Sequence, residues 1–217
     1  FSLLSCSTES PVILPWVELL AALVAGTGAY AFCRRSLKLG YVASLWAGWL
    51  FPLSGFFVLW QGFPTSGAVY WLPWLLLAVE RVARSARTPK VRPVAGLAFV
   101  TALVLVSGHI DVAGQVLVGA GVYALGCLVR AARRPPVART WRRGLIRLTL
   151  GWALGFALAA PHVWPLLEYA PGGARMERRG AGTEERPPLG VSSLVQTVWP
   201  DAYGTNRRGS LWLGTGN

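Results

Sequence analysis

The chain has 217 residues, of which 53% are hydrophobic and only 14% are charged, and its 21 Lys and Arg against 9 Asp and Glu give a formal charge of +12. Charged residues make up about a quarter of ordinary soluble domains, so this composition excludes that class and predicts a protein of the lipid bilayer. A nucleic-acid-binding protein is the rival interpretation of the high charge, but such a protein would display its basic residues on a soluble face.

A helix that spans the hydrocarbon core needs about 20 predominantly apolar residues. In chain order, the segments that meet or approach this length are residues 11–32, 41–60, 64–80, 93–107, 112–129 and 145–169. The third is the weakest, because its fully apolar part runs only from Ala68 to Val79, which would also fit a re-entrant or interfacial segment. The connection before it is uncharged and the one after it is strongly basic, so we interpret it as a crossing.

The basic residues are concentrated in every second connection between these segments. They are Arg34, Arg35 and Lys38, then Arg81, Arg84, Arg87, Lys90 and Arg92, then Arg130, Arg133, Arg134, Arg139, Arg142 and Arg143. The connections Gln61–Val69 and Gly108–Asp111 contain no Lys or Arg. Short loops enriched in Lys and Arg lie on the cytoplasmic side of membrane proteins. The pattern therefore predicts six crossings, with both ends of the sequence on the extracytoplasmic side.

The predicted fold class is all-α, a polytopic bundle of about six transmembrane helices in residues 1–170. Residues 171–217 are rich in Gly, Pro, Arg and Glu, and we expect an extracytoplasmic loop region there, truncated at its C-terminal end. Within it, Ser192 or Ser193 is suited to cap a short helix that extends to Trp199 with one apolar side. We expect that helix to lie on the membrane surface. The missing initial Met leads us to interpret the chain as a portion of a longer protein.

Polar residues outside the basic connections gather near the predicted extracytoplasmic level. They are Glu18, Gln61, His109, Asp111, His162 and Glu168. Glu18 lies about 10 Å into the first span, at 1.5 Å per residue. Carboxylates inside membranes are costly and often mark functional sites, which makes Glu18 a candidate for substrate binding together with Gln61, His162 and Glu168. The structural alternative is a Glu that hydrogen-bonds to a neighbouring helix or to interfacial water.

His109 and Asp111 occupy the turn between the fourth and fifth segments. Imidazole and carboxylate groups can act as a general acid/base pair or help to bind a divalent cation, so both residues are catalytic candidates and a metal is a possible cofactor. The structural alternative is a polar cap in which Asp111 accepts the first N–H groups of the following helix.

Three arginines follow the last span on the side where the pattern of basic connections predicts few: Arg175, Arg178 and Arg179. The guanidinium group binds phosphates through paired hydrogen bonds, so these residues are candidates for binding a lipid-linked phosphate or pyrophosphate. The alternative is pairing with Glu177, Glu184 and Glu185 in a solvated loop.

Several motifs together resemble bacterial YfhO-type multi-pass membrane proteins. The motifs are Leu53-Ser54-Gly55-Phe56, Trp71-Leu72-Pro73-Trp74, Ser107-Gly108-His109, Ala160-Pro161, Pro165-Leu166-Leu167-Glu168, and Trp199-Pro200-Asp201 with Gly204. The resemblance covers nearly the whole chain. It implies a member of the GT-C superfamily, glycosyltransferases that take a sugar from a polyprenyl-phosphate donor and act on the outer face of the bacterial inner membrane. The implied acceptor belongs to the cell envelope.

The chain departs from that family in two places. After the Gly-His pair the family often has Pro followed by Gln or Glu, whereas Ile110 and Asp111 stand here. The acidic residue that such enzymes place in their first outer loop is expected before Phe1 or near Glu9. A transporter or flippase for a lipid-linked substrate and a non-catalytic assembly subunit remain alternatives. A transporter predicts polar residues through the whole membrane depth, whereas the sequence has them mainly at one level.

Overall fold

The computed structural model describes residues 13–85, 91–133 and 138–172 of the chain. These residues form helices and turns and contain no strand. The chain divides into two compact units, Phe1–Val163 and Trp164–Asn217. The described part of the second unit is the C-terminal end of one helix, so the packing below belongs to the first unit. The expected surface helix near Trp199 lies outside the described residues.

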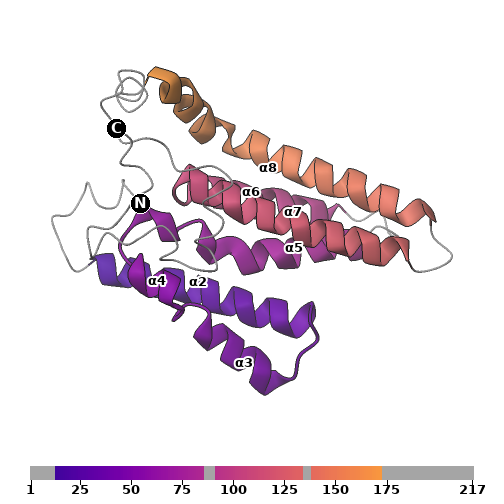
Figure 1. The fold of residues 1–217 in the computed structure, drawn as a ribbon, viewed down its shortest axis with the longest axis horizontal. Coiled ribbons are helices and arrows are strands. Elements are labelled where there is room, and N and C mark those ends of the chain that lie inside the picture. The colour runs from indigo at the N-terminus through magenta and orange to yellow at the C-terminus, as the bar shows by residue number, and fades with distance from the viewer. Residues whose placement is uncertain (1–12, 86–90, 134–137, 173–217) are drawn as a thin grey trace, which may run out of the picture. The chain divides into compact units, whose positions relative to one another are not determined.

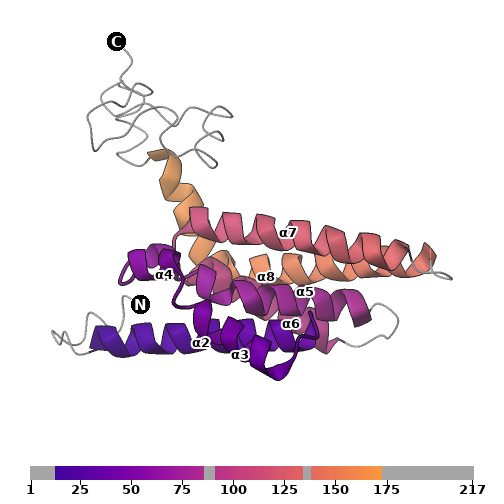
Figure 2. The ribbon, with the colours of Figure 1, turned by 60° about the horizontal axis from the view of Figure 1, so that its bottom comes forward.

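The helices follow one another with short connections. They are α2 (Ile13–Arg35), α3 (Tyr41–Leu50), α4 (Gly55–Leu59), the 3₁₀ turns η1 (Pro64–Ser66) and η2 (Val69–Trp71), α5 (Leu72–Arg84), α6 (Arg92–Val106), α7 (Ile110–Ala132) and α8 (Ala138–Gly172). In both views the long helices α2, α5, α6 and α7 run roughly along a common direction (Figure 1, Figure 2). Such a parallel-axis arrangement is that of a helix bundle.

Four helical segments of the described residues are long and apolar enough to cross a membrane. They are Leu14–Arg35, Tyr41–Leu59, Ile110–Ala132 and Trp141–Tyr169. Large apolar side chains on these segments are exposed, for example Trp46 at 62%, Trp49 at 65% and Val118 at 70%. Lipid chains would cover such side chains, whereas water would not solvate them favourably. The prediction of an all-helical fold is confirmed for the described residues, and the four apolar helices support a multi-pass membrane protein, whereas a count of six spans stays a prediction.

The limits predicted for the third and fourth segments differ from the structure. Residues 64–80 do not form one helix, because the chain makes two 3₁₀ turns before α5 begins beside Pro73, and α5 then continues to Arg84. Pro lacks an N–H donor, and it fits at the start of a helix rather than within it. Segment 93–107 is observed as α6, which has 15 residues.

The beginning of the last helix also lies earlier than predicted. Helix α8 starts at Ala138 instead of residue 145, so that Arg139, Arg142 and Arg143 belong to its first turns and not to a connecting loop. Gly144 does not interrupt it. Arg and Lys are good helix formers, and their side chains can extend from a helix end toward the membrane surface. The prediction that these arginines belong to a connecting loop is therefore wrong for Arg139, Arg142 and Arg143.

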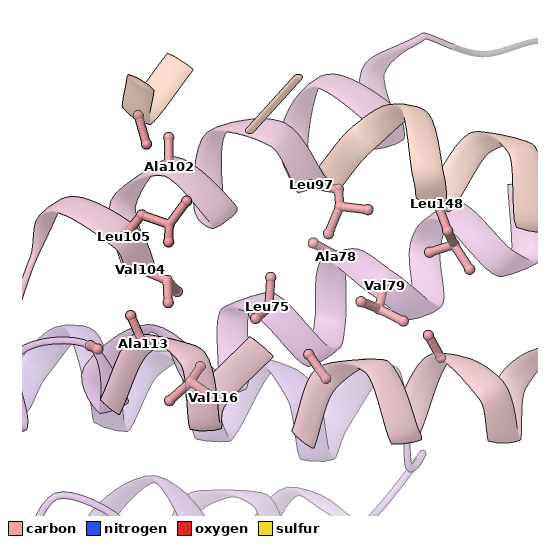
Figure 3. Packing of buried hydrophobic residues seen from close by; sticks show 14 of the residues in the cluster. Leu75, Ala78, Val79, Leu97, Ala102, Val104, Leu105, Ala113, Val116 and Leu148 are labelled. Carbon is pink, nitrogen blue, oxygen red and sulfur yellow. The ribbon is translucent and has the colours of Figure 1, made fainter. Parts of the chain in front are cut away.

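Helix α5 is the packing centre of the first unit, with α2, α6 and α7 against it. More than half of its 13 residues are buried: Pro73, Leu75, Leu77, Ala78, Val79, Glu80 and Val82. Figure 3 shows Leu75 and Val79 of α5 among Leu97 of α6, Val116 of α7 and Leu148 of α8. Helix α5 is thus enclosed by its neighbours, although it is not among the helices that are long and apolar enough to cross a membrane.

Glycines allow the closest helix approaches. A Cβ at Gly26 of α2 would lie 2.6 Å from the carbonyl oxygen of Gly48 in α3, and one at Gly151 of α8 would lie 2.7 Å from Leu97 of α6. Gly155 similarly faces Thr101 of α6. Small residues at helix contacts are typical of membrane bundles, where association depends on close van der Waals packing.

Replacement of Gly26 by Ala is expected to destabilise the contact between α2 and α3. The added Cβ would meet backbone atoms, which cannot move aside like the end of a side chain, and overpacking of this kind costs about 1–3 kcal/mol. Gly96→Ala in α6 is the matched control, because nothing lies within 4 Å of a Cβ there. Thermal unfolding of the protein in detergent should show a lower midpoint for Gly26→Ala alone. Equal midpoints for the two variants would contradict the packing described.

Candidate functional site

One end of the first unit, which we call the polar end, contains a hydrogen-bonded network around Glu18. The backbone N–H of Gly62 donates to Glu18 Oε1 at 3.2 Å, and the hydroxyl of Tyr70 donates to Glu18 Oε2 at 3.0 Å. The Tyr70 oxygen also lies 3.0 Å from Ser66 Oγ. Both oxygens of the partly buried carboxylate thus have a donor, which stabilises its charge at this depth.

The local sequence explains how Gly62 and Tyr70 reach Glu18. Gly62 has a φ of +78°, a backbone conformation that favours glycine, and this turns its N–H toward α2. Tyr70 is 8% exposed and stacks on Phe57 of α4, with ring centroids 4.9 Å apart and planes 10° from parallel. The phenol is therefore fixed by packing on one side and by Ser66 on the other. Glu18 ties three separate chain segments together.

His109 and Asp111 form the second polar feature of this end. His109 Nδ1 and Asp111 Oδ2 are 3.5 Å apart, and the two side chains are 55% and 79% exposed. His109 is the N-cap of α7 but makes no side-chain cap hydrogen bond, while Asp111 lies in the first turn, where a carboxylate is favourable. The two side chains are close enough to act together on a substrate, and an imidazole beside a carboxylate is a group that can serve as a general base.

Backbone contacts connect the His109 turn to the segment after Gly62. The N–H of His109 donates to the carbonyl of Pro64 at 3.3 Å, and Trp71 Nε1 donates to Ser107 Oγ at 2.9 Å. A Cβ on Gly67 would lie 2.0 Å from the Ser107 carbonyl oxygen, so no other residue fits this position without movement. The same 3₁₀ segment therefore carries contacts to Glu18 and to the His109 turn, and it places both at the polar end.

The other predicted substrate-binding residues are less well connected. Gln61 is exposed and directly precedes Gly62, so it belongs to the polar end. His162 and Glu168 are exposed on α8, on either side of the division between the two units. Arg175, Arg178 and Arg179 lie outside the described residues. The structure thus places Glu18, Gln61, His109 and Asp111 at one end of the first unit, and the roles predicted for all of these candidates stay predictions.

The opposite end of the first unit, which we call the basic end, contains a buried carboxylate that the sequence argument passed over. Glu80 of α5 is 4% exposed. Its Oε1 lies 2.5 Å from Arg84 Nη2, and its Oε2 accepts a hydrogen bond from the hydroxyl of Tyr123 in α7. The sequence contained a sign of this ion pair, because Glu80 is the last residue of the predicted third segment and lies four residues, one helical turn, before Arg84. No role for Glu80 was predicted from the sequence.

Arg84 extends this group to α2. Its guanidinium donates to the carbonyls of Ser36 at 3.1 Å and Arg35 at 3.4 Å, at the C-terminal end of α2, where carbonyl groups lack helical partners. Arg147 of α8 donates to the carbonyl of Ser85 at 2.6 Å. Arginines at this end therefore satisfy backbone oxygens, in addition to any contact with lipid headgroups.

Among the residues that the structure describes, no group of three or more His, Cys, Asp or Glu side chains is close enough to hold a metal ion. His109 and Asp111 together would supply two of the ligands that a divalent cation needs, and the exposed setting leaves room for others.

A scan of protein-family models found none that matches the chain, and searches of curated proteins and of solved structures also found no match. A function for this chain therefore has to be inferred from its own residues and their arrangement. The two strongest groups are the Glu18 network with the His109 turn at the polar end and the Glu80 group at the basic end.

The hydrogen bond between Glu18 and Tyr70 should be measurable by a double-mutant cycle. We expect Glu18→Ala and Tyr70→Phe each to lower the thermal unfolding midpoint in detergent, and the double variant to lose little more than the larger single loss. Groups in one hydrogen-bond network show coupling energies of about 0.5–3 kcal/mol. Glu168→Ala, an exposed carboxylate on α8, is the matched control and should leave the midpoint unchanged. Strictly additive losses would show that the two side chains do not interact.

Proposed function

We propose that the chain is the helical membrane portion of a GT-C-type glycosyltransferase. In this proposal the protein transfers a sugar from a polyprenyl-phosphate donor to a cell-envelope acceptor on the outer face of the bacterial inner membrane. The observation that carries it is the gathering of Glu18, Gln61, His109 and Asp111 at the end of the bundle away from the arginines. The resemblance of the sequence to YfhO-type proteins supplies the reaction class.

The proposed topology has six crossings, including α5 and α6. At a rise of 1.5 Å per residue, Glu18 and Arg35 are about 26 Å apart along α2, close to the thickness of a hydrocarbon core of about 30 Å. Segment 64–84 contacts Glu18 through Tyr70 and the end of α2 through Arg84, so it extends over the same distance. Helix α6 returns to the polar end, where Ser107 contacts Trp71. The contacts of Tyr70, Arg84 and Ser107 therefore support crossings by α5 and α6, although neither helix is long and apolar enough to be recognised as a spanning helix.

The proposed chemistry joins an acceptor hydroxyl to the anomeric carbon of the sugar as the bond from that carbon to the phosphate oxygen breaks. The hydroxyl proton passes to His109, which Asp111 orients, and the polyprenyl phosphate leaves with the electron pair of the broken bond. Arg175, Arg178 and Arg179, or a divalent cation, would stabilise the departing phosphate. Gln61, His162 and Glu168 would contact the donor or the acceptor, and Glu18 would hold the loop that contains Gln61.

Substitution of His109 by Ala or of Asp111 by Asn should lower the rate of sugar transfer by about 100-fold, the contribution typical of a positioned acid or base. The assay is release of radiolabelled sugar from a polyprenyl-phosphate donor by the full-length protein in proteoliposomes. Gln115→Ala, also exposed and about one turn further along α7, is the control that should retain activity.

Full activity in both variants would remove His109 and Asp111 from the mechanism. Absence of sugar release from every common donor would contradict the transferase itself.

One observation favours a transporter as the second candidate: the hydroxyl of Thr101, within α6, is fully buried without a hydrogen-bond partner. Movement of labelled donor across the vesicle membrane, without release of sugar, would identify that function.

A further inference from the structure

Helix α5 combines two properties that conflict in a membrane. It has only 13 residues and three of them are charged, Glu80, Arg81 and Arg84, and it is not among the four helices that are long and apolar enough to span. It is nevertheless enclosed by α2, α6 and α7, with Leu75, Val79 and Val82 completely buried. Hydrophobicity alone does not explain how this helix is held at the centre of the bundle.

The charge of Glu80 is the main obstacle to that position. A carboxylate that is 4% exposed and lacks partners would cost several kcal/mol in an apolar surrounding. Here Arg84 contacts one carboxylate oxygen and the Tyr123 hydroxyl donates to the other. Loss of one partner of a buried charge is more harmful than loss of the whole group, because the remaining charge stays uncompensated.

These partners come from different helices. Arg84 lies four residues after Glu80 on α5 itself and can pair with it in the isolated helix, but its remaining donors bind the Ser36 and Arg35 carbonyls of α2. Tyr123 belongs to α7, and its ring also packs edge-on against Phe32 of α2, with centroids 5.7 Å apart. The group is thus complete only when α2, α5 and α7 are packed together.

We propose that Glu80, Arg84 and Tyr123 form a charge clasp that holds α5 inside the membrane, so that α5 crosses only when it is packed between α2 and α7. This inference rests on the six-crossing topology proposed above. The transferase chemistry is not required for it, since the clasp lies at the basic end. Its function is to allow a short, charged helix to connect the two ends of the bundle.

The test is a cysteine-accessibility experiment with the full chain in intact bacterial cells. Cys6, Cys33 and Cys127 are replaced by Ala, and Val91→Cys is the reporter, because Val91 is 76% exposed directly before α6. A membrane-impermeant maleimide should not label the reporter until the cells are permeabilised.

The double variant Arg84→Gln/Tyr123→Phe should raise the labelled fraction in intact cells severalfold, because Glu80 then lacks both partners and α5 with its following loop stays outside. Addition of Glu80→Leu to this variant should restore protection, since it removes the charge that needs the partners. Arg81→Gln/Tyr41→Phe is the matched control, with the same loss of one cation and one hydroxyl at exposed positions. It should remain protected.

Each outcome bears on the proposal. Protection of Arg84→Gln/Tyr123→Phe equal to that of the control would overturn the clasp and leave the topology standing. Failure of Glu80→Leu to restore protection would also overturn it, because the defect would not arise from an uncompensated carboxylate. Labelling of the reporter in intact cells before any clasp substitution would refute the crossing of α5, and with it both the topology and the clasp. Release of sugar by the same protein is measured in a separate assay, and its result tests only the proposed transferase activity.

Discussion

A carboxylate buried within an apolar bundle is tolerated only where its neighbours compensate its charge. Glu80 lies on the helix that α2, α6 and α7 enclose, and it is stabilised by Arg84 and Tyr123. The group joins the C-terminal end of α2 to α5 and α7. At the other end of the same helices, Tyr70, just before α5, hydrogen-bonds to Glu18 of α2.

The polar end depends on backbone geometry more than on side chains. The positive φ of Gly62 presents an N–H to Glu18, and the contact between Gly67 and the Ser107 carbonyl brings the His109 turn against the 3₁₀ segment. Both positions need glycine. A side chain at Gly62 would be strained by the positive φ, and a Cβ at Gly67 would collide with the Ser107 carbonyl oxygen. A short irregular segment between α4 and α5 thus positions two polar features that are about 90 residues apart in the sequence.

The contacts of Glu18 favour one of the two roles that its position in the sequence suggested. Its position inside an apolar segment suggested either substrate binding or a satisfied structural carboxylate, and its contacts with Gly62 and Tyr70 account for both of its oxygens. That geometry suits a residue that fixes the loop containing Gln61. His109 and Asp111, in contrast, have largely exposed side chains. We therefore assign the reactive part of the proposed site to this pair.

The amino-acid sequence predicts an all-helical protein rich in apolar helices, the approximate positions of those helices and the separation of basic residues from Glu18, His109 and Asp111 along the chain. These properties follow from composition and from charge along the chain, which require no knowledge of packing. It did not determine the limits of α5, the early start of α8 or the partners of Glu18 and Glu80. Those depend on contacts between residues far apart in the sequence, such as Tyr123 with Glu80 and Ser107 with Gly67. The position of α5 at the centre of the packing could not be read from the sequence, because the charge of Glu80 becomes tolerable there only once Arg84 and, from the neighbouring α7, Tyr123 become its partners.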